Sequence, residues 1–225
     1  MFVVVGAFLS ACDNSTPTNS NPKFSYDSIQ DVRDGYTYKT IGIGTQTWMA
    51  ENLNYAGSGS DSVGLCYAGS VDSCKKFGRL YTWSEANAFP LAFDTLAKAV
   101  VLPNQGICPN GWHVPSVGEW NVLFAFVGYE NNATVLKSTT DWLGDYNSGT
   151  DQYGFHALPS GWHDVKAGFV ENSYYAAFWD SNRPLGASDD SVRLGWHQSF
   201  DKGFRYVTDR SDSKATGASL RCIKN

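Results

Sequence analysis

The run CPNGWHVPSVGEW, residues 108–120, constrains the fold most, because it contains the start of a helix whose buried face can be identified. Ser116 and Glu119 have the spacing of a capping box, in which each side chain accepts the backbone N–H of the other residue. The apolar residues that follow recur with the period of one helix face, and Gly128 supplies a stop; they are Trp120, Leu123, Phe124 and Val127. We therefore predict a core helix here, with a structural role for Glu119.

Length and charge limit the class of partner. The chain has 225 residues, enough for one sizeable core, and a net charge of −5. Nucleic-acid binding needs clustered Lys and Arg to displace counterions, and the sequence has no such cluster. We expect no nucleic-acid partner. Aromatic residues make up 15% of the chain, which suits either carbohydrate contacts or an ordinary core.

The first residues predict export and lipidation. The apolar run FVVVGAFLSAC is too short to span a bilayer and ends in small residues before a cysteine. Residues 9–12 resemble the lipobox of bacterial lipoproteins, which implies cleavage before Cys12 and a lipid on that residue. No basic residue opens the segment, as one normally does in a signal, and a plain secretory signal or a misassigned start is the alternative. We assign residues 1–12 to a lipoprotein signal and 13–30 to a polar tether, and we expect a lipid-anchored protein on the extracytoplasmic face of the bacterial envelope.

Export places the chain in an oxidising compartment, where an even number of cysteines predicts disulfides. Four cysteines remain without Cys12, and they permit three pairings. We favour Cys66 with Cys74, which closes a short loop, and Cys108 with Cys222, which joins the middle of the chain to its end. Zinc is the rival use of such thiols, but the chain has no C-x-x-C pair.

The pattern along the chain predicts an α+β fold. Residues 34–48 alternate apolar and polar side chains after an Asp-Gly pair, which indicates a turn and one or two strands. Residues 78–89 indicate a strand end followed by a helix at about 83–88. Beyond residue 128, short aromatic pieces separated by turn residues indicate a loop-rich β half. The expected architecture has two helices in the first half and a small curled antiparallel sheet with long loops.

Several groups of residues could carry chemistry. His113, His163 and His197 end three GWH triplets, but they lack the helical spacing of a zinc site. Paired acids such as Asp189 and Asp190 could serve glycoside hydrolysis, whose two carboxyls need a separation that sequence does not reveal. The stretches SDD, WDSN and TDRSDS supply the oxygen ligands that calcium prefers, without EF-hand spacing. We therefore expect no cofactor other than calcium, and leave the metal unassigned.

Six ordered blocks of sequence resemble one family. They are DGYTYKTIGIGTQTWMAENLNY, GRLYTWSEA, CPNGWHVPSVGEWNVL, GFHALPSGWHDVKAGF, AAFWDSN and SLRCIKN. In order and spacing they resemble the Fibrobacter succinogenes major paralogous domain over residues 31–225. The positions in its blocks are Trp48, Met49, Asn52, Leu53, Cys108, Gly111, Trp112, Pro115, Glu119, Trp120, Arg221 and Cys222.

The resemblance has consequences for fold and activity. Members of the family are similar in fold to C-type-lectin-like domains, a fold shared with formylglycine-generating enzymes. The resemblance therefore implies a C-type-lectin-like fold for this chain, and it supports the pairing of Cys108 with Cys222. It also implies an exported or surface lipoprotein. It supplies no catalytic residues, and formylglycine generation would need redox-active cysteines in the C-terminal half of the domain, where only Cys222 lies.

Together these observations predict a lipid-anchored binding module rather than an enzyme. The expected partner is a polysaccharide or a surface protein, with glycan recognition preferred; a protein-adhesion or display module and a polysaccharide hydrolase are the alternatives. Indole faces stack on sugar rings, while acids and amides bind hydroxyl groups, so we assign binding to the loops of the second half. The candidate residues are Trp142, Trp162, Trp179, Trp196, Asp180 and Asn182. At least half of these tryptophans should be buried, and a platform requires that not all are.

Overall fold

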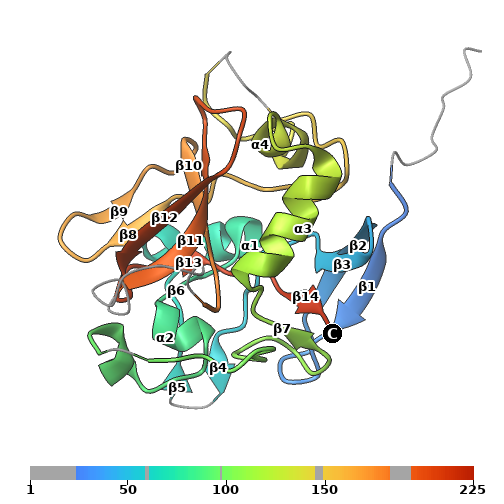
Figure 1. Cartoon of the computed structure of the whole chain (residues 1–225). Coiled ribbons are helices and arrows are strands. Elements are labelled where there is room, and N and C mark those ends of the chain that lie inside the picture. The colour runs from blue at the N-terminus through green and yellow to red at the C-terminus, as the bar shows by residue number, and fades with distance from the viewer. Residues whose placement is uncertain (1–23, 59–60, 97, 145–148, 183–193) are drawn as a thin grey trace, which may run out of the picture.

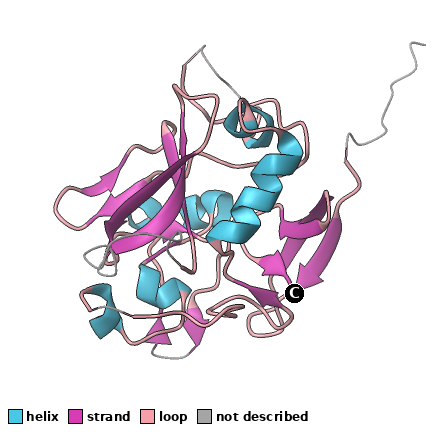
Figure 2. Ribbon diagram, in the orientation of Figure 1, coloured by secondary structure: helices cyan, strands magenta, loops and turns pink. Residues whose placement is uncertain are grey.

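The computed structural model of the chain describes residues 24–58, 61–96, 98–144, 149–182 and 194–225. Cys12, the signal segment and residues 13–23 of the expected tether lie outside the described residues. Within the described part, no helix is long and apolar enough to cross a membrane. Figure 2 shows short helices and strands that are joined by long loops.

Four α-helices and fourteen strands are present in the described residues. The helices are α1 Val71–Phe77, α2 Trp83–Ala86, α3 Val117–Val127 and α4 Asn132–Leu136, with 3-10 turns η1 Tyr67–Gly69 and η2 Leu91–Asp94. The strands are β1 Asp27–Gln30, β2 Thr37–Ile43, β3 Gln46–Met49, β4 Gly57–Ser58, β5 Asp61–Ser62, β6 Leu80–Tyr81, β7 Trp112–His113, β8 Trp162–Asp164, β9 Gly168–Val170, β10 Tyr175–Trp179, β11 Leu194–Asp201, β12 Thr208–Ser213, β13 Ala218–Ser219 and β14 Ile223–Lys224.

Most strands belong to two five-stranded sheets (Figure 1). The first has the order β1-β2-β3-β14-β7 and is antiparallel, with Ile223 of β14 paired to both Trp48 and His113. The second has the order β12-β11-β10-β13-β6, in which only β10 and β13 are parallel. Two hairpins, β4-β5 and β8-β9, stand apart. The α+β class with few helices and largely antiparallel sheets is confirmed.

Helix α3 lies between the two sheets and supplies the centre of the core (Figure 1). Its predicted apolar face is buried, and Trp120 is 0% exposed. The Trp120 ring lies 4.7 Å from that of Trp48 in β3 and 6.0 Å from that of Phe178 in β10. The same cluster includes Ile41 from β2 and Phe200 from β11. One amphipathic helix therefore joins both sheets into a single core.

The entry to α3 has the predicted capping box. Ser116 Oγ accepts the Glu119 N–H at 3.3 Å, and Glu119 Oε2 accepts the Ser116 N–H at 2.8 Å. A second capping box, formed by Thr82 and Glu85, begins α2, so the predicted helix after residue 82 is present but shorter. Helices α1 and α4 were not predicted, because five to seven residues are too few to show a helical period.

Glu119 has a further partner that its spacing did not reveal. Its Oε1 lies 2.6 Å from His113 Nε2, and His113 Nδ1 lies 2.7 Å from Asn225 Oδ1. Burial disfavours the imidazolium, but the bonds to Glu119 and Asn225 outweigh it, so the pKa of His113 is raised. Burial likewise opposes ionisation of Glu119, but hydrogen bonds from His113 and Ser116 lower its pKa. The pair links β7, the start of α3 and the C-terminus.

This pair predicts a pH-dependent stability. The contribution of His113 is complete below the ordinary histidine pKa of 6.5 and is lost as the pH rises through its raised pKa. That of Glu119 is complete above 4.5 and is lost as the pH falls through its lowered pKa. We expect His113→Gln to cost about 1 kcal/mol more at pH 5.5 than at pH 8.5, measured by urea unfolding. An equal cost at both pH values would contradict the ion pair.

The disulfides and the domain boundary complete the fold. Both favoured pairings are present, Cys66–Cys74 and Cys108–Cys222. The predicted tether, residues 13–30, extends too far into the domain, because Asp27–Gln30 forms β1 and pairs with β2 along its whole length. Phe24 also packs against the core. The ordered domain therefore includes residues 24–30, whose polar composition suits an edge strand as well as a linker.

Candidate functional site

The four candidate tryptophans do not form one platform. Trp142 is 8% exposed and Trp179 is 0% exposed, and their indole N–H groups donate to the carbonyls of Ala157 at 3.0 Å and Tyr81 at 2.7 Å. Both are therefore core residues, whose faces pack against the protein rather than a ligand. A residue type that suits both sugar stacking and packing gives no means of telling the two apart from sequence.

Trp162 and Trp196 are partly exposed but lie on opposite faces of the second sheet. The Trp162 ring lies 5.9 Å from that of Tyr175, which shares a face with His197 of β11. Trp196 is the neighbour of His197 in the same strand and so points to the other face. Neither indole N–H has a hydrogen-bond partner among the described residues. The two rings cannot contact the same sugar.

The two candidate polar residues are part of the structure around α3. Asp180 is 0% exposed, and its Oδ2 accepts the Gln198 side-chain amide at 3.0 Å. Burial raises the pKa of Asp180 well above its ordinary value. Asn182 Oδ1 accepts the Val117 N–H at 3.2 Å and so holds the first turn of the helix. The expected acid of the platform is a buried group.

Calcium remains a prediction. Asp209 shares the Gln198 amide, at 2.6 Å, but no group of three or more His, Cys, Asp or Glu side chains placed to hold a metal occurs in the described ranges. The acids of the SDD stretch, Asp189 and Asp190, lie outside the described residues.

A chain of contacts between Asp212, His197 and Ser199 was missed by sequence reasoning. His197 Nε2 lies 2.8 Å from Asp212 Oδ2, and its Nδ1 lies 3.0 Å from Ser199 Oγ. Ser199 Oγ also lies 2.6 Å from the Tyr175 hydroxyl, and both His197 and Ser199 are 1% exposed. A nucleophilic serine must reach its substrate, so this buried chain is a structural network between β10, β11 and β12.

A cavity of about 270 Å³ lies beside the first sheet. Four separate segments supply its lining: β1–β2 and its flanks, the segment after β3, the end of α1, and a loop before β8. The lining residues are Tyr26, Tyr36, Lys39, Ala50, Glu51, Asn52, Asn54, Cys74, Lys75, Lys76, Gly78, His156 and Leu158. Tyrosine rings, an amide and charged groups together give this cavity a lining suited to a polar ligand.

The wall formed by Asn52 is built by close backbone packing. A Cβ at Gly78, whose φ is +74°, would lie 2.7 Å from Asn52 Cβ and 2.8 Å from the Leu53 carbonyl oxygen. The Leu53 backbone N–H donates to the Leu220 carbonyl at 2.8 Å, and the Asn52 side-chain amide donates to the Phe77 carbonyl at 2.8 Å. Only glycine fits at residue 78, and α1 is thereby held against the segment after β3.

Beneath Asn52 lies the buried guanidinium of Arg221. Its Nη2 donates to Asn52 Oδ1 at 2.5 Å, its Nη1 donates to the Phe155 carbonyl, and it lies 4.3 Å from the centre of the Phe155 ring. Burial lowers the pKa of Arg221 to about 9, so the group stays cationic at neutral pH. A positive charge therefore lies behind the cavity wall.

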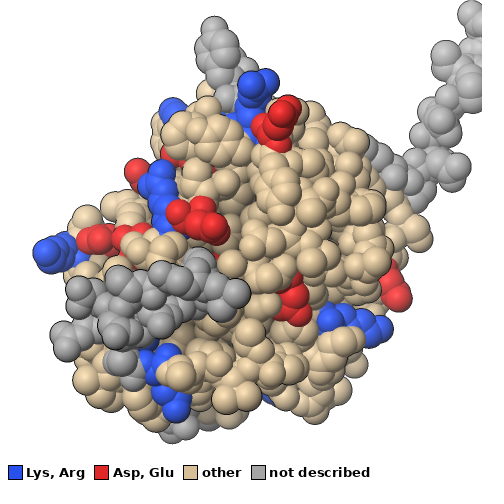
Figure 3. Space-filling view, in the orientation of Figure 1, with Lys and Arg blue, Asp and Glu red and all other residues tan. Residues whose placement is uncertain are grey.

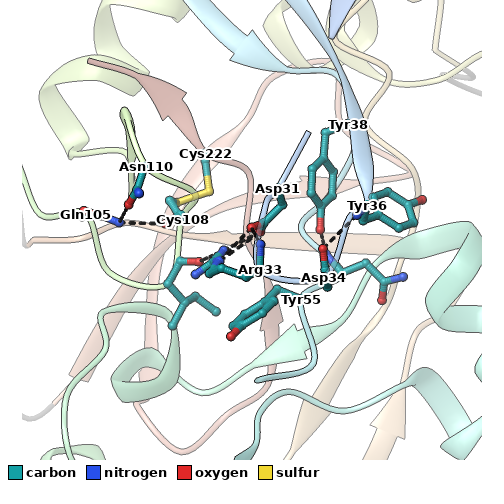
Figure 4. A network of polar contacts seen from close by, with 12 residues as sticks. Asp31, Arg33, Asp34, Tyr36, Tyr38, Tyr55, Gln105, Cys108, Asn110 and Cys222 are labelled. Atoms are coloured by element: carbon teal, nitrogen blue, oxygen red, sulfur yellow. Dashed lines mark hydrogen bonds and ion pairs between the residues drawn. A yellow bond between two sulfur atoms is a disulfide. The ribbon is translucent and has the colours of Figure 1, made fainter. Parts of the chain in front are cut away.

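A network of polar contacts fixes the turn that precedes Tyr36 (Figure 4). Arg33 pairs with the buried carboxylate of Asp31, with Nη2 to Oδ2 at 2.6 Å, and donates to the Ile107 carbonyl at 2.9 Å. Its guanidinium lies 3.9 Å from the centre of the Tyr55 ring. The network lies beside the Cys108–Cys222 disulfide (Figure 4). The turn before β2 is therefore anchored to the middle and the end of the chain.

The two tyrosines of the cavity differ in how firmly the surrounding protein holds their rings. Tyr36 lies 4.7 Å from the Tyr38 ring and is held by the core beneath it. Tyr26 is 37% exposed, and the Lys39 ammonium lies 6.0 Å from its ring centre. Burial, together with the charge of Asp151, raises the pKa of Tyr26, so its hydroxyl stays protonated at neutral pH. An uncharged aromatic wall is the surface on which a sugar ring stacks.

Comparison with known proteins gave one match. Residues 41–224 match the Fibrobacter succinogenes major domain, and no curated protein or solved structure matches the chain. Asn52 of the cavity lies in the matched segment and in the block DGYTYKTIGIGTQTWMAENLNY. Tyr26, Tyr36 and Lys39 lie before residue 41, where the matched segment begins. Because the match covers most of the chain, the protein belongs to the Fibrobacter succinogenes major domain family.

Proposed function

We propose that this chain is a non-catalytic glycan-binding module, held on the extracytoplasmic face of the bacterial envelope by a lipid on Cys12. The cavity beside the first sheet carries the proposal, because it combines the Tyr26 and Tyr36 rings with the amide of Asn54 and the ammonium groups of Lys39 and Lys75. Rings and polar groups in one concave site match the alternating apolar faces and hydroxyl groups of a sugar. Its volume, about 270 Å³, is slightly below the range of drug-sized pockets and suits a single ring.

A C-type-lectin-like fold is part of the proposal. In support, β14 returns the end of the chain to β3 and β7, and the Cys108–Cys222 disulfide closes the same region. Long connections outside the sheets are also typical of such domains, in which loops on a rigid framework carry the binding residues.

Adhesion to a protein surface is the second candidate, favoured by a separate aromatic patch. Phe204 and Tyr206, in the turn between β11 and β12, are 38% and 49% exposed and stack with centres 5.5 Å apart. The Lys202 ammonium lies 4.1 Å from the ring of exposed Tyr174 nearby. Figure 3 shows a face on which charged side chains form small groups between wide uncharged areas. Exposed aromatic clusters of this kind mark contact surfaces.

The test is retention of the full chain, with both disulfides formed, on a panel of soluble and insoluble polysaccharides. We expect retention without released sugar, and a loss of affinity of about three- to tenfold in Tyr26→Ala. Tyr206→Ala is the matched control, because it removes the same side chain from the other patch.

Each outcome distinguishes a candidate function. Loss of retention in Tyr206→Ala alone would move the contact to the second patch, and no retention on any polysaccharide would favour a protein partner. Released sugar would contradict the non-catalytic proposal; of the described lining residues only Glu51 carries a carboxylate, whereas glycoside hydrolysis uses two. Retention that a chelator abolishes would establish a requirement for calcium.

A further inference from the structure

Lysines outnumber carboxylates among the described residues that line the cavity. The described lining residues include three lysines, Lys39, Lys75 and Lys76, against the single carboxylate of Glu51. Lys76 is ion-paired with Asp141 and so is already neutralised. The Lys75 ammonium lies 3.1 Å from Asp72 Oδ1. These side chains are 70% and 89% exposed, and exposed ion pairs of this kind are weak and contribute little to stability.

Of the three lysines, Lys39 is the one whose ammonium forms no ion pair among the described residues. Its ammonium lies 6.0 Å from the Tyr26 ring centre. Glu51 Oε2 accepts the backbone N–H of Lys39 at 2.7 Å, and its carboxylate keeps its negative charge at the cavity. The buried guanidinium of Arg221 lies behind Asn52, where the carboxylates of Asp151 and Glu51 offset part of its positive charge.

We propose that the cavity recognises a carboxylate-bearing sugar, a hexuronic acid unit of an acidic glycan; this inference rests on the proposed glycan-binding function. The sugar ring would lie against Tyr26, and its carboxylate would face the ammonium groups of Lys39 and Lys75. Ammonium–carboxylate hydrogen bonds are stronger than neutral ones, so charge selects acidic over neutral sugars.

The experiment compares an oligogalacturonide with its full methyl ester, which has the same ring but no charge. The full chain is titrated calorimetrically with each ligand at low and at high salt. We expect the acid to bind at least about tenfold more tightly than the ester at low salt, and this advantage to shrink at high salt. Lys39→Gln/Lys75→Gln should remove the advantage of the acid over the ester.

The control is Lys166→Gln, which removes one charge from the exposed turn between β8 and β9. It should keep the preference for the acid, and thermal unfolding of each variant shows that it is folded. Equal affinity for acid and ester, or a preference that survives in the double variant, overturns this inference. If neutral polysaccharides bind and the acid has no advantage, only this inference fails; if no glycan of either kind binds, the proposed function itself fails.

Discussion

Replacing Cys108 and Cys222 together by alanine is expected to lower the free energy of unfolding by about 4 to 5 kcal/mol. The disulfide joins residues 114 positions apart, so its removal frees a large part of the unfolded chain. In the folded protein it connects the loop before β7 to β14, beside the Arg33 network (Figure 4). Chemical unfolding followed by circular dichroism measures the change.

The second disulfide supplies the matched control. Cys66 and Cys74 are only 8 positions apart, and the same loop-entropy model gives about 2 to 3 kcal/mol for their removal. The long-range pair should therefore be the more costly one to remove. Equal losses for the two double variants would show that chain entropy does not determine their contributions.

Trp120→Ala is expected to cost about 3 to 5 kcal/mol, because a large aromatic side chain leaves a cavity that its neighbours fill only in part. Trp120 contacts both sheets: its ring lies 4.7 Å from that of Trp48 in β3 and 6.0 Å from that of Phe178 in β10. Its indole N–H has no hydrogen-bond partner among the described residues, so the loss would come from packing. Urea unfolding at neutral pH measures it.

Phe126→Ala on the same helix is the control for this variant. Phe126 is 55% exposed, so its truncation removes an aromatic ring from α3 without opening the core, and it should cost about 1 kcal/mol or less. A similar cost for both variants would mean that the position of Trp120 between the two sheets does not determine its contribution to stability. Trp120→Phe should recover part of the loss.

Local spacing was sufficient to predict the central helix. The capping box of Ser116 and Glu119 and the buried face that begins at Trp120 are relations between residues a few positions apart. Such relations are encoded in the chain itself, since a helix brings residues three and four apart together. The compartment and an even cysteine count predicted two disulfides but left three pairings open, and the ordered blocks identified the family, whose resemblance supported the pairing of Cys108 with Cys222.

Burial of the aromatic residues could not be predicted in the same way. Trp179 and Trp196 occur in similar short strands, yet the first is enclosed by the second sheet and the second is partly exposed. The difference depends on which strands pair and which face each side chain takes, and these are long-range relations. The proposed platform therefore failed at Trp142 and Trp179, where packing accounts for the residue.

The sequence alone thus determines the helix entry, the presence of disulfides and the family, because the helix entry is a short-range pattern, the disulfides follow from the cysteine count, and the family is read from ordered blocks of residues. The cavity was decided only by the tertiary structure. Its lining extends from Tyr26 to Leu158, and it forms because β2, the segment after β3 and the end of α1 pack together over Arg221. No local pattern marks residues that become neighbours only when separate segments pack, and a glycine such as Gly78 shows its role only once Asn52 lies against it.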